Sequence, residues 1–257
     1  AFASDDLLRS YVGSVQDAIT SLHLKDQRPA AIMLDTIFDC PGTIEAPQDY
    51  FRQIYETVRE AGGLVIADEV QAGFCRTGNH WWGFQHDRAV PDIVTLGKPM
   101  GAGHPLAAVV TTPDIAANFA AKSDYFNTFG GNPVSTAVGK AVIDVIDAES
   151  LLENVTNTGA YTRAGLQQLQ NRYESIGDVR GRGLFLSVDL VKDRASKTPD
   201  ADAARQMANL MKAEGVLISM HGRYENVLKI RPPMVFSKEN ADRLLTALDV
   251  CFGKINN

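Results

Sequence analysis

The sequence predicts an α/β fold, with a mainly parallel sheet in a large first part and a smaller α+β part after it. Continuous apolar runs of strand length recur along the first part, and a segment with helical spacing separates two of them. The pattern changes after residue 132, where a long helical stretch begins. Because strands that are buried on both sides read as continuous apolar runs, we expect helices on both faces of the parallel sheet.

Four strands and one helix are predicted in the first part. The helix covers residues 49–63, where Phe51, Ile54, Tyr55 and Val58 recur at helical spacing before two glycines that end it. The fourth strand follows the third so soon that we expect it to fold back or to pair nearby. The predicted strands are residues 30–35, 64–69, 92–98 and 106–112.

The second part is predicted to be helical first and mixed afterwards. Residues 133–173 read as a long helix with a break, and an amphipathic helix near residues 238–253 ends the chain. Short strands are predicted between them, at residues 183–191, 215–220 and 226–233. We therefore divide the chain into residues 1–140, which form part of a large ligand-binding domain, and residues 141–257, which form a connecting helix and a small C-terminal domain.

Charge and composition exclude several classes of partner. The net charge of −6 disfavours nucleic acid and anionic membranes, since these partners usually need a basic face. The uncharged run of residues 99–113 is interrupted by glycine and proline, so it does not predict a membrane span. Three widely spaced cysteines without a CxxC pair, and first residues without signal-peptide character, predict a reducing, cytoplasmic location.

Polar side chains at the ends of the predicted strands carry the candidate chemistry. Asp35, Asp68, Glu69 and Lys98 each follow an apolar run, and ligands of open α/β sheets bind outside such carboxyl ends. Burial there would favour the neutral, nucleophilic form of Lys98 and would require a cationic partner for Asp68. Pyridoxal phosphate meets both needs, because a lysine forms a Schiff base with it and an acid pairs with its protonated ring nitrogen.

A simpler interpretation stays open at this stage. An Asp-Glu pair after a strand is often a solvated turn, and a lysine before Pro-x-Gly often lies on a surface loop. Rival motifs are weaker, because the sequence has no P-loop, no GxGxxG turn followed by an acid, and no GxSxG nucleophile elbow. The five histidines show no metal-ligand spacing, so no metal site is predicted.

Five collinear blocks, spread through nearly the whole chain, resemble class III pyridoxal-phosphate-dependent aminotransferases. Within this class, the segments GKPMGAGHP, VKDRASKTP and NVLKIRPPM most resemble the branch of ethanolamine-phosphate and phosphohydroxylysine phospho-lyases. The resemblance implies fold type I, with only part of the large domain present. The blocks are GGLVIADEVQAGFCRTG (62–78), PDIVTLGKPMGAGHPLAAVVTT (91–112), YFNTFGGNPVS (125–135), GDVRGRGLFLSVDLV (177–191) and LKIRPPM (228–234).

The resemblance implies cofactor roles for four residues of the first part. Lys98 would form the Schiff base with pyridoxal 5'-phosphate and move the substrate proton, and Asp68 would pair with the ring nitrogen. Val70 would pack on a face of the ring, and Gln71 would lie near its phenolic oxygen. Pyridoxal phosphate is therefore the expected cofactor.

The resemblance also implies two contacts outside that group. Thr128 would reach the cofactor phosphate of a neighbouring subunit, which predicts a homodimer with shared active sites. Arg231 would hold a substrate carboxylate with its planar guanidinium. In the predicted strand, Lys229 and Arg231 share one face. This alternation fits an arginine that faces a cleft, and it fits a solvated face as well.

The chain departs from the family pattern in three places. Asp35 and Phe38 stand where the family usually has Glu and, three residues later, Gln, so the polarity of the substrate at that edge is left undefined. Cys75 stands where Gly is usual, and we do not expect it to be catalytic. The family's N-terminal portion, which cradles the cofactor phosphate and stacks an aromatic on the ring, is absent. We therefore expect these residues alone to bind cofactor weakly and to show no turnover.

Three functions follow as predictions. The first is transamination, in which an amino group moves from an amine or amino acid to an oxo acid through Lys98. The second is a phospho-lyase that eliminates phosphate and ammonia from a phosphorylated amino alcohol or amino acid without an oxo-acid acceptor. The third is a non-catalytic fragment that keeps the fold, although the presence of Lys98 and Asp68 argues against long-standing loss of the chemistry.

Overall fold

The computed structural model describes residues 4–255, which divide into two compact units. Two short segments from the first third of the sequence belong to the second unit. The division at residue 140 into a cofactor-binding domain and a C-terminal domain remains a prediction. Unit 1 runs to Thr36 and contains Ala46–Phe74 and Trp82–Val145, whereas unit 2 contains Ile37–Glu45, Cys75–Trp81 and the chain from Ile146 onward.

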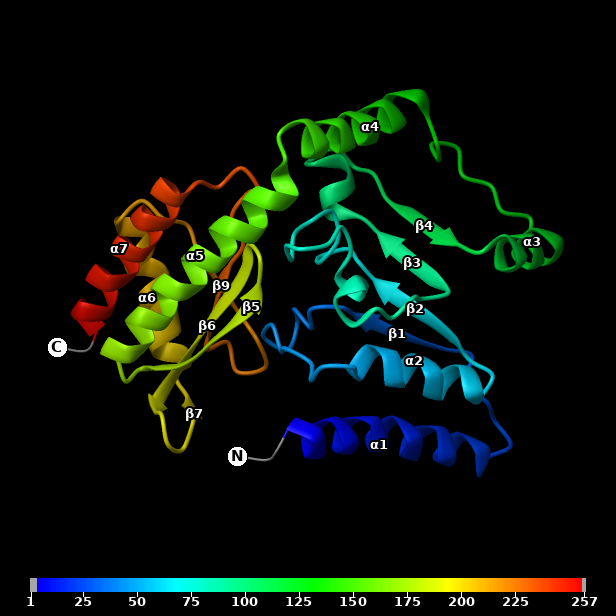
Figure 1. Ribbon diagram of the computed structural model, residues 1–257, viewed down its shortest axis with the longest axis horizontal. Helices are drawn as coiled ribbons and strands as arrows, with labels where there is room; N and C mark the ends of the chain where they lie inside the picture. The colour runs from blue at the N-terminus through cyan, green and yellow to red at the C-terminus, as the bar shows by residue number, and fades with distance from the viewer. Residues whose placement is uncertain (1–3, 256–257) are drawn as a thin grey trace. The chain divides into compact units, whose positions relative to one another are not determined.

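Unit 1 is built on a four-stranded sheet in the order β1-β2-β3-β4 (Figure 1). β1 (Ala31–Asp35), β2 (Leu64–Asp68) and β3 (Ile93–Leu96) run parallel to one another. β4 (Ala108–Thr111) returns antiparallel to β3. The mainly parallel sheet, the positions of its four strands and the return of the fourth strand are therefore confirmed.

One face of this sheet is covered and the other is open. α2 (Tyr50–Glu60) packs against β2, and the four apolar residues that predicted this helix are all buried. Val65 and Ala67, on one face of β2, are fully buried. Met33 and Val109 point to the opposite face by register and are 53% and 67% exposed. Helix α2 packs on one face of the sheet, and the expectation of helices on both faces remains a prediction.

The other elements of unit 1 connect or flank the sheet. α1 packs alongside α2 (Figure 1). Two short 3-10 helices, η1 and η2, occupy the connections after β2 and after β3. α1 and α3 were not predicted, whereas α4 is the first half of the predicted long helix. The bounds are α1 (Ser4–His23), η1 (Gly83–Asp87), η2 (Lys98–Gly101), α3 (Pro113–Lys122) and α4 (Pro133–Ala148), the last of which ends in unit 2.

Unit 2 consists of an antiparallel sheet in the order β5-β6-β9-β8, with β7 paired to β6. Three helices pack on it, and their side chains form one core with those of β5, β6 and β9. The predicted α+β character is confirmed, although β5, β7 and α6 were not predicted. The elements are α5 (Leu151–Arg172), β5 (Ile176–Arg182), β6 (Phe185–Asp193), β7 (Thr198–Pro199), α6 (Ala201–Ala213), β8 (Ser219–His221), β9 (Val227–Ile230) and α7 (Lys238–Ile255).

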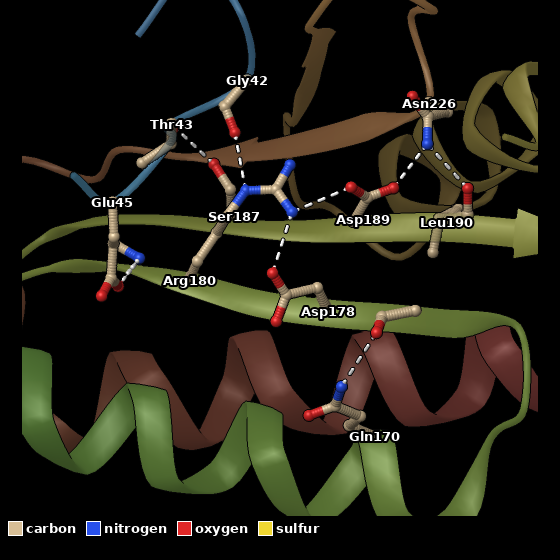
Figure 2. A network of polar contacts seen from close by, with 12 residues as sticks. Gly42, Thr43, Glu45, Gln170, Asp178, Arg180, Ser187, Asp189, Leu190 and Asn226 are labelled. Atoms are coloured by element: carbon tan, nitrogen blue, oxygen red, sulfur yellow. Dashed lines mark hydrogen bonds and ion pairs between the residues drawn. The ribbon is translucent and has the colours of Figure 1, made fainter. Parts of the chain in front are cut away.

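The segment Ile37–Glu45 is hydrogen-bonded to β5 and β6 of this sheet (Figure 2). Arg180 of β5 donates from Nε to the carbonyl oxygen of Gly42 at 2.9 Å. Ser187 of β6 donates from its hydroxyl to Thr43 Oγ1 at 2.8 Å. Alternation along β6 turns Leu186 and Val188 into the helical core, so the neighbouring polar positions face the segment. The polar face of these strands thus finds its hydrogen-bond partners in a segment that is distant in sequence.

Candidate active site

Polar residues meet at the carboxyl end of the parallel strands. The strand registers pair Asp35 with Asp68, and Asp68 with Thr95. Thr95 Oγ1 donates to Asp68 Oδ1 at 3.2 Å, and the backbone N–H of Val70 donates to the same oxygen at 3.0 Å. Lys98 follows three residues after Thr95. The predicted acid and the predicted lysine therefore stand at adjacent strand ends, where α/β sheets bind their ligands.

Lys98 is the first residue of η2, and its side chain is exposed in the described chain. The burial that was expected to favour its neutral amine is therefore not observed. Gly97, just before it, is buried, and a Cβ on Gly97 would lie 3.3 Å from Val70 Cγ2. Glycine at this position lets the exit of β3 pass closely against the Val70 side chain.

The deeply buried acid of this region is Glu69, not Asp68. Glu69 is 0% exposed and accepts hydrogen bonds from Thr36 Oγ1 at 3.1 Å, from the Gly83 N–H at 2.8 Å and from the Phe84 N–H at 2.9 Å. Burial raises the pKa of Glu69 to about 7, although the hydrogen bonds from these three residues oppose the rise. The sequence placed Glu69 at a strand end but assigned it no role of its own, because its partners lie on separate segments and leave no local pattern.

Gln71 and Thr128 occupy different settings in unit 1. Gln71 is half-buried in the turn after β2. Thr128 lies in an exposed loop, where Asn127 Oδ1 accepts hydrogen bonds from the backbone N–H groups of Phe129 and Gly130 at 3.2 Å and 3.0 Å. The Asn127 side chain thus fixes the backbone on both sides of Thr128. Cofactor contact by Gln71 and Thr128 remains a prediction.

Arg231 belongs to unit 2, directly after β9. Its guanidinium carbon lies 5.6 Å from the centre of the Phe185 ring. The half-buried Arg76 donates to the backbone carbonyls of Leu184 and Pro232. Burial, followed by the charge of Arg231, lowers the pKa of Arg76 to about 10. An anion bound here would relieve the repulsion between the two guanidinium groups, and carboxylate binding by Arg231 remains a prediction.

A second polar cluster in unit 2 was not predicted. Asp39 lies 3.2 Å from His221 Nδ1 and accepts a hydrogen bond from Lys229 Nζ at 2.7 Å, while His221 Nε2 lies 3.1 Å from Ser187 Oγ. Acid, imidazole and hydroxyl follow the order of a hydrolase triad. Ser187 is fully buried, however, and its hydroxyl donates to Thr43, so no substrate can reach it. The cluster therefore serves the structure of unit 2.

Cys75 has the setting of an inert thiol. Burial raises its pKa to about 12, which keeps the thiol protonated at neutral pH. Its backbone φ of 64° lies in the left-handed region that glycine adopts without strain, which explains why glycine suits this position. Within residues 4–255, no group of three or more His, Cys, Asp or Glu side chains could hold a metal ion.

The strand-end residues fit pyridoxal phosphate. Both hydrogen bonds described for Asp68 end on Oδ1, so its second oxygen, Oδ2, would be the one to pair with a protonated ring nitrogen. The exposed amine of Lys98 stands one strand away, and Val70 offers an apolar surface next to both strand ends. A carboxylate, an amine and an apolar side chain are the groups that this cofactor requires around its ring.

Comparison with solved structures defines the class of the protein. A phospholyase from Arthrobacter, in complex with phosphoethanolamine, matches with a TM-score of 0.95 and 41% identity, over 98% of this chain and 61% of that chain. An amine transaminase from an uncultivated Pseudomonas species, in its PLP-bound form, matches with a TM-score of 0.90 and 30% identity, over 98% of this chain and 58% of that chain. The fold is that of the fold type I pyridoxal-phosphate-dependent transferases.

The family follows from the sequence. The family model described as aminotransferase class-III matches residues 5–252, and the chain belongs to that family. A relative from Arabidopsis thaliana, named alanine--glyoxylate aminotransferase 2 homolog 2, mitochondrial, is 47% identical over 99% of this chain and 52% of its own length. The chain thus spans about half the length of this curated relative. The family and the PLP-bound neighbour support pyridoxal phosphate as the cofactor.

Proposed function

We propose that the protein carrying this chain is a transaminase that moves an amino group from an amine or amino acid to an oxo acid. One observation carries the proposal. Asp68 and Lys98 stand at adjacent strand ends in a chain of the class-III aminotransferase family, and Thr95 between them donates a hydrogen bond to Asp68. An acid and an amine so placed can serve the two ends of one cofactor ring.

The residues after β2 and β3 would have separate roles at the cofactor. Bound pyridoxal phosphate supplies an electron-withdrawing ring that stabilises the charge left when a substrate loses its proton. Asp68 would keep the ring nitrogen protonated, and Lys98 would hold the cofactor and then take up and return the substrate proton. Val70 would pack on the ring, and Gln71 would lie near the phenolic oxygen. The hydrogen bond from the Val70 N–H to Asp68 supports placing these residues on one turn.

The proposal includes a homodimer in which Thr128 of one subunit reaches the cofactor phosphate of the other. Large aromatic side chains are exposed on both sides of Thr128, and Phe126 and Phe129 are 84% and 79% exposed. Exposed apolar side chains grouped on one segment are typical of association surfaces. This exposure supports an interface around Thr128.

Location and membrane attachment have separate support. Within residues 4–255, no helix is long and apolar enough to cross a membrane. The name of the Arabidopsis relative places that protein in mitochondria. A cytoplasmic location for this protein therefore remains a proposal.

The test of the central assignment is Lys98→Ala in the full-length protein. The wild type should change its visible cofactor absorbance on addition of an amino donor, and borohydride should fix the cofactor to the chain. Lys98→Ala should lose the link that borohydride fixes between cofactor and chain, whereas Lys122→Ala, a change of another exposed lysine of unit 1, should keep both properties. Cofactor fixed by borohydride to the Lys98→Ala protein would overturn the assignment.

A phospho-lyase is the second candidate, because the match to the Arthrobacter phospholyase reaches a TM-score of 0.95. That reaction would use the same Asp68 and Lys98 but would expel phosphate from the carbon adjacent to the amine-bearing carbon, so it needs no acceptor. O-phosphoethanolamine incubated without any oxo acid separates the two functions. Release of phosphate and ammonia would make elimination the main reaction, and product formation that requires an oxo acid would make it transamination.

A further inference from the structure

We propose that Glu69 is a positioning residue whose buried carboxylate fixes the turn that carries Asp68, Val70 and Gln71. The inference rests on the proposed function, since these three residues need fixed positions only if they contact a cofactor. Glu69 itself points into the core of unit 1 and is 0% exposed, so it would act through its neighbours.

The backbone of Glu69 is anchored on both sides. Its N–H donates to the carbonyl oxygen of Thr95 on β3 at 3.0 Å, and its carbonyl oxygen accepts from the Gly73 N–H at 3.0 Å. A Cβ on Gly73 would lie only 2.8 Å from that carbonyl oxygen. The turn after β2 therefore has little room to move as long as Glu69 stays in place.

The side chain ties this turn to two other segments. Oε1 accepts from Thr36 Oγ1, directly after β1, and from the Phe84 N–H, while Oε2 accepts from the Gly83 N–H. A Cβ on Gly83 would lie 2.2 Å from Thr36 Oγ1, so the segments touch without a gap. The carboxylate thus joins the end of β1, the end of β2 and the first N–H groups of η1.

Both carboxylate oxygens are needed for this junction. A glutamine offers one acceptor oxygen and would turn its NH2 group toward a backbone N–H donor. Two ionisable side chains on neighbouring elements interact electrostatically with Glu69. They are Asp35 at the end of β1, whose charge raises the pKa of Glu69, and Tyr55 of α2, whose pKa rises with burial and then with the charge of Glu69.

The experiment compares Glu69→Gln with Glu60→Gln, an exposed glutamate at the end of α2, in the full-length protein. We expect Glu69→Gln to raise the Kd for pyridoxal phosphate about tenfold, the size expected for one buried, unpaired donor. The pH at which the visible absorbance of the bound cofactor titrates should move toward the value in Asp68→Asn. Amide exchange of residues 70–73 should become faster in the cofactor-free protein. Glu60→Gln should change none of these quantities.

A milder variant guards against a folding defect. Thr36→Val removes one donor to Glu69 and should move the titration of the cofactor in the same direction by less, whereas Thr36→Ser keeps the hydroxyl and should restore the wild-type value. The inference is overturned if Glu69→Gln binds and titrates the cofactor as the wild type does while Lys98→Ala abolishes covalent binding. If Lys98→Ala still binds the cofactor covalently, the proposed function fails instead.

Discussion

Lys229 of β9 donates to Asp39 at 2.7 Å across 190 residues of sequence. Both side chains are largely buried, with 13% and 4% of their surfaces exposed. Burial alone would raise the pKa of Asp39, but the hydrogen bonds and charges of His221 and Lys229 outweigh it and lower the pKa to about 2. This buried pair fixes the segment Ile37–Glu45 on unit 2.

The first prediction concerns this pair. Asp39→Asn leaves the Lys229 cation buried without an acid and should lower the free energy of unfolding by about 3–5 kcal/mol. Because the pKa of Asp39 is depressed from 3.8 to about 2, the contribution is complete above pH 3.8 and is lost as the pH falls toward 2. Urea unfolding between pH 2 and pH 7 measures both effects.

The matched control for this measurement is Asp178→Asn. Asp178 also pairs with a largely buried arginine side chain, Arg180, which is 12% exposed, but its own side chain is 54% exposed. Its loss should cost at most about 1 kcal/mol. If both variants lost the same free energy of unfolding, burial of the Asp39–Lys229 pair would not increase its contribution to stability.

The second prediction concerns the pH dependence caused by Glu69. Its pKa is raised from 4.5 to about 7, so the folded protein holds a proton that the unfolded chain releases within this range. Stability should therefore fall as the pH rises from 4.5 to about 7, by about 3 kcal/mol in total, and then level off. Glu69→Gln should lack this decline. Unfolding curves that differ by a constant amount at every pH would contradict the prediction.

The third prediction concerns two helical glycines whose replacement by alanine should change stability in opposite directions. A Cβ on Gly159 of α5 would lie 2.3 Å from the carbonyl oxygen of Gly183, whereas nothing lies within 4 Å of a Cβ on Gly13 of α1. Gly159→Ala should destabilise by at least about 2 kcal/mol, because backbone must shift. Gly13→Ala should stabilise by roughly 0.5–1 kcal/mol through helix propensity. Thermal unfolding of both variants checks the signs, and a neutral Gly159→Ala would refute the close contact.

The fourth prediction concerns the proposed dimer. Changing Phe126 and Phe129 together to Ser should raise the dimer dissociation constant at least about tenfold, because each ring would lose its burial in the interface. Sedimentation equilibrium of the full-length protein measures this constant. Leu217→Ser, which removes another apolar side chain that is 85% exposed, serves as the control. An unchanged constant in the double variant would place the interface elsewhere.

The fifth prediction concerns Arg231. Arg231→Gln should lower kcat/KM for alanine about 10- to 100-fold, since a charged hydrogen bond to the carboxylate would be lost. The kcat/KM for isopropylamine, which has a methyl group in place of that carboxylate, should change little. Arg231 and Arg243 are both exposed and line one cavity of about 610 Å³ in unit 2. Arg243→Gln should leave kcat/KM for both amines unchanged. If kcat/KM fell equally for alanine and isopropylamine, Arg231 would have a structural role and would not bind the carboxylate.

The strands that carry the site could be predicted because their apolar runs are local. β2 and β3 were found from residues 64–69 and 92–98, and their pairing brought Asp68 and Lys98 to adjacent strand ends. α6 was missed although Asp200 caps it and the buried Met207 and Met211 recur at helical spacing, so its signal was present. β5 was missed because it has few apolar residues, and its charged side chains Asp178 and Arg180 join a polar network that only the folded unit provides.

The energetic details of the site could not be read from the sequence. Glu69 and Asp68 are neighbours, but only the packing of Thr36, Gly83 and Phe84 decides that Glu69 is the one to be buried. The exposure of Lys98 also opposes the burial expected from its position after an apolar run. The local sequence pattern predicts which side chains lie at a strand end, whereas segments distant in sequence determine how exposed those side chains are to solvent.

The early position of Asp39 in the chain has a consequence for synthesis. Lys229 leaves the ribosome 190 residues after Asp39, which takes roughly 10–40 s at usual rates of translation. For most of that interval, the segment Ile37–Glu45 has none of its partners, because Arg180 of β5 follows Gly42 by 138 residues and Ser187 of β6 follows Thr43 by 144. The nascent chain must therefore carry this segment in a water-exposed form until β5 and β6 emerge, and a chaperone that binds such segments could bind it during that time.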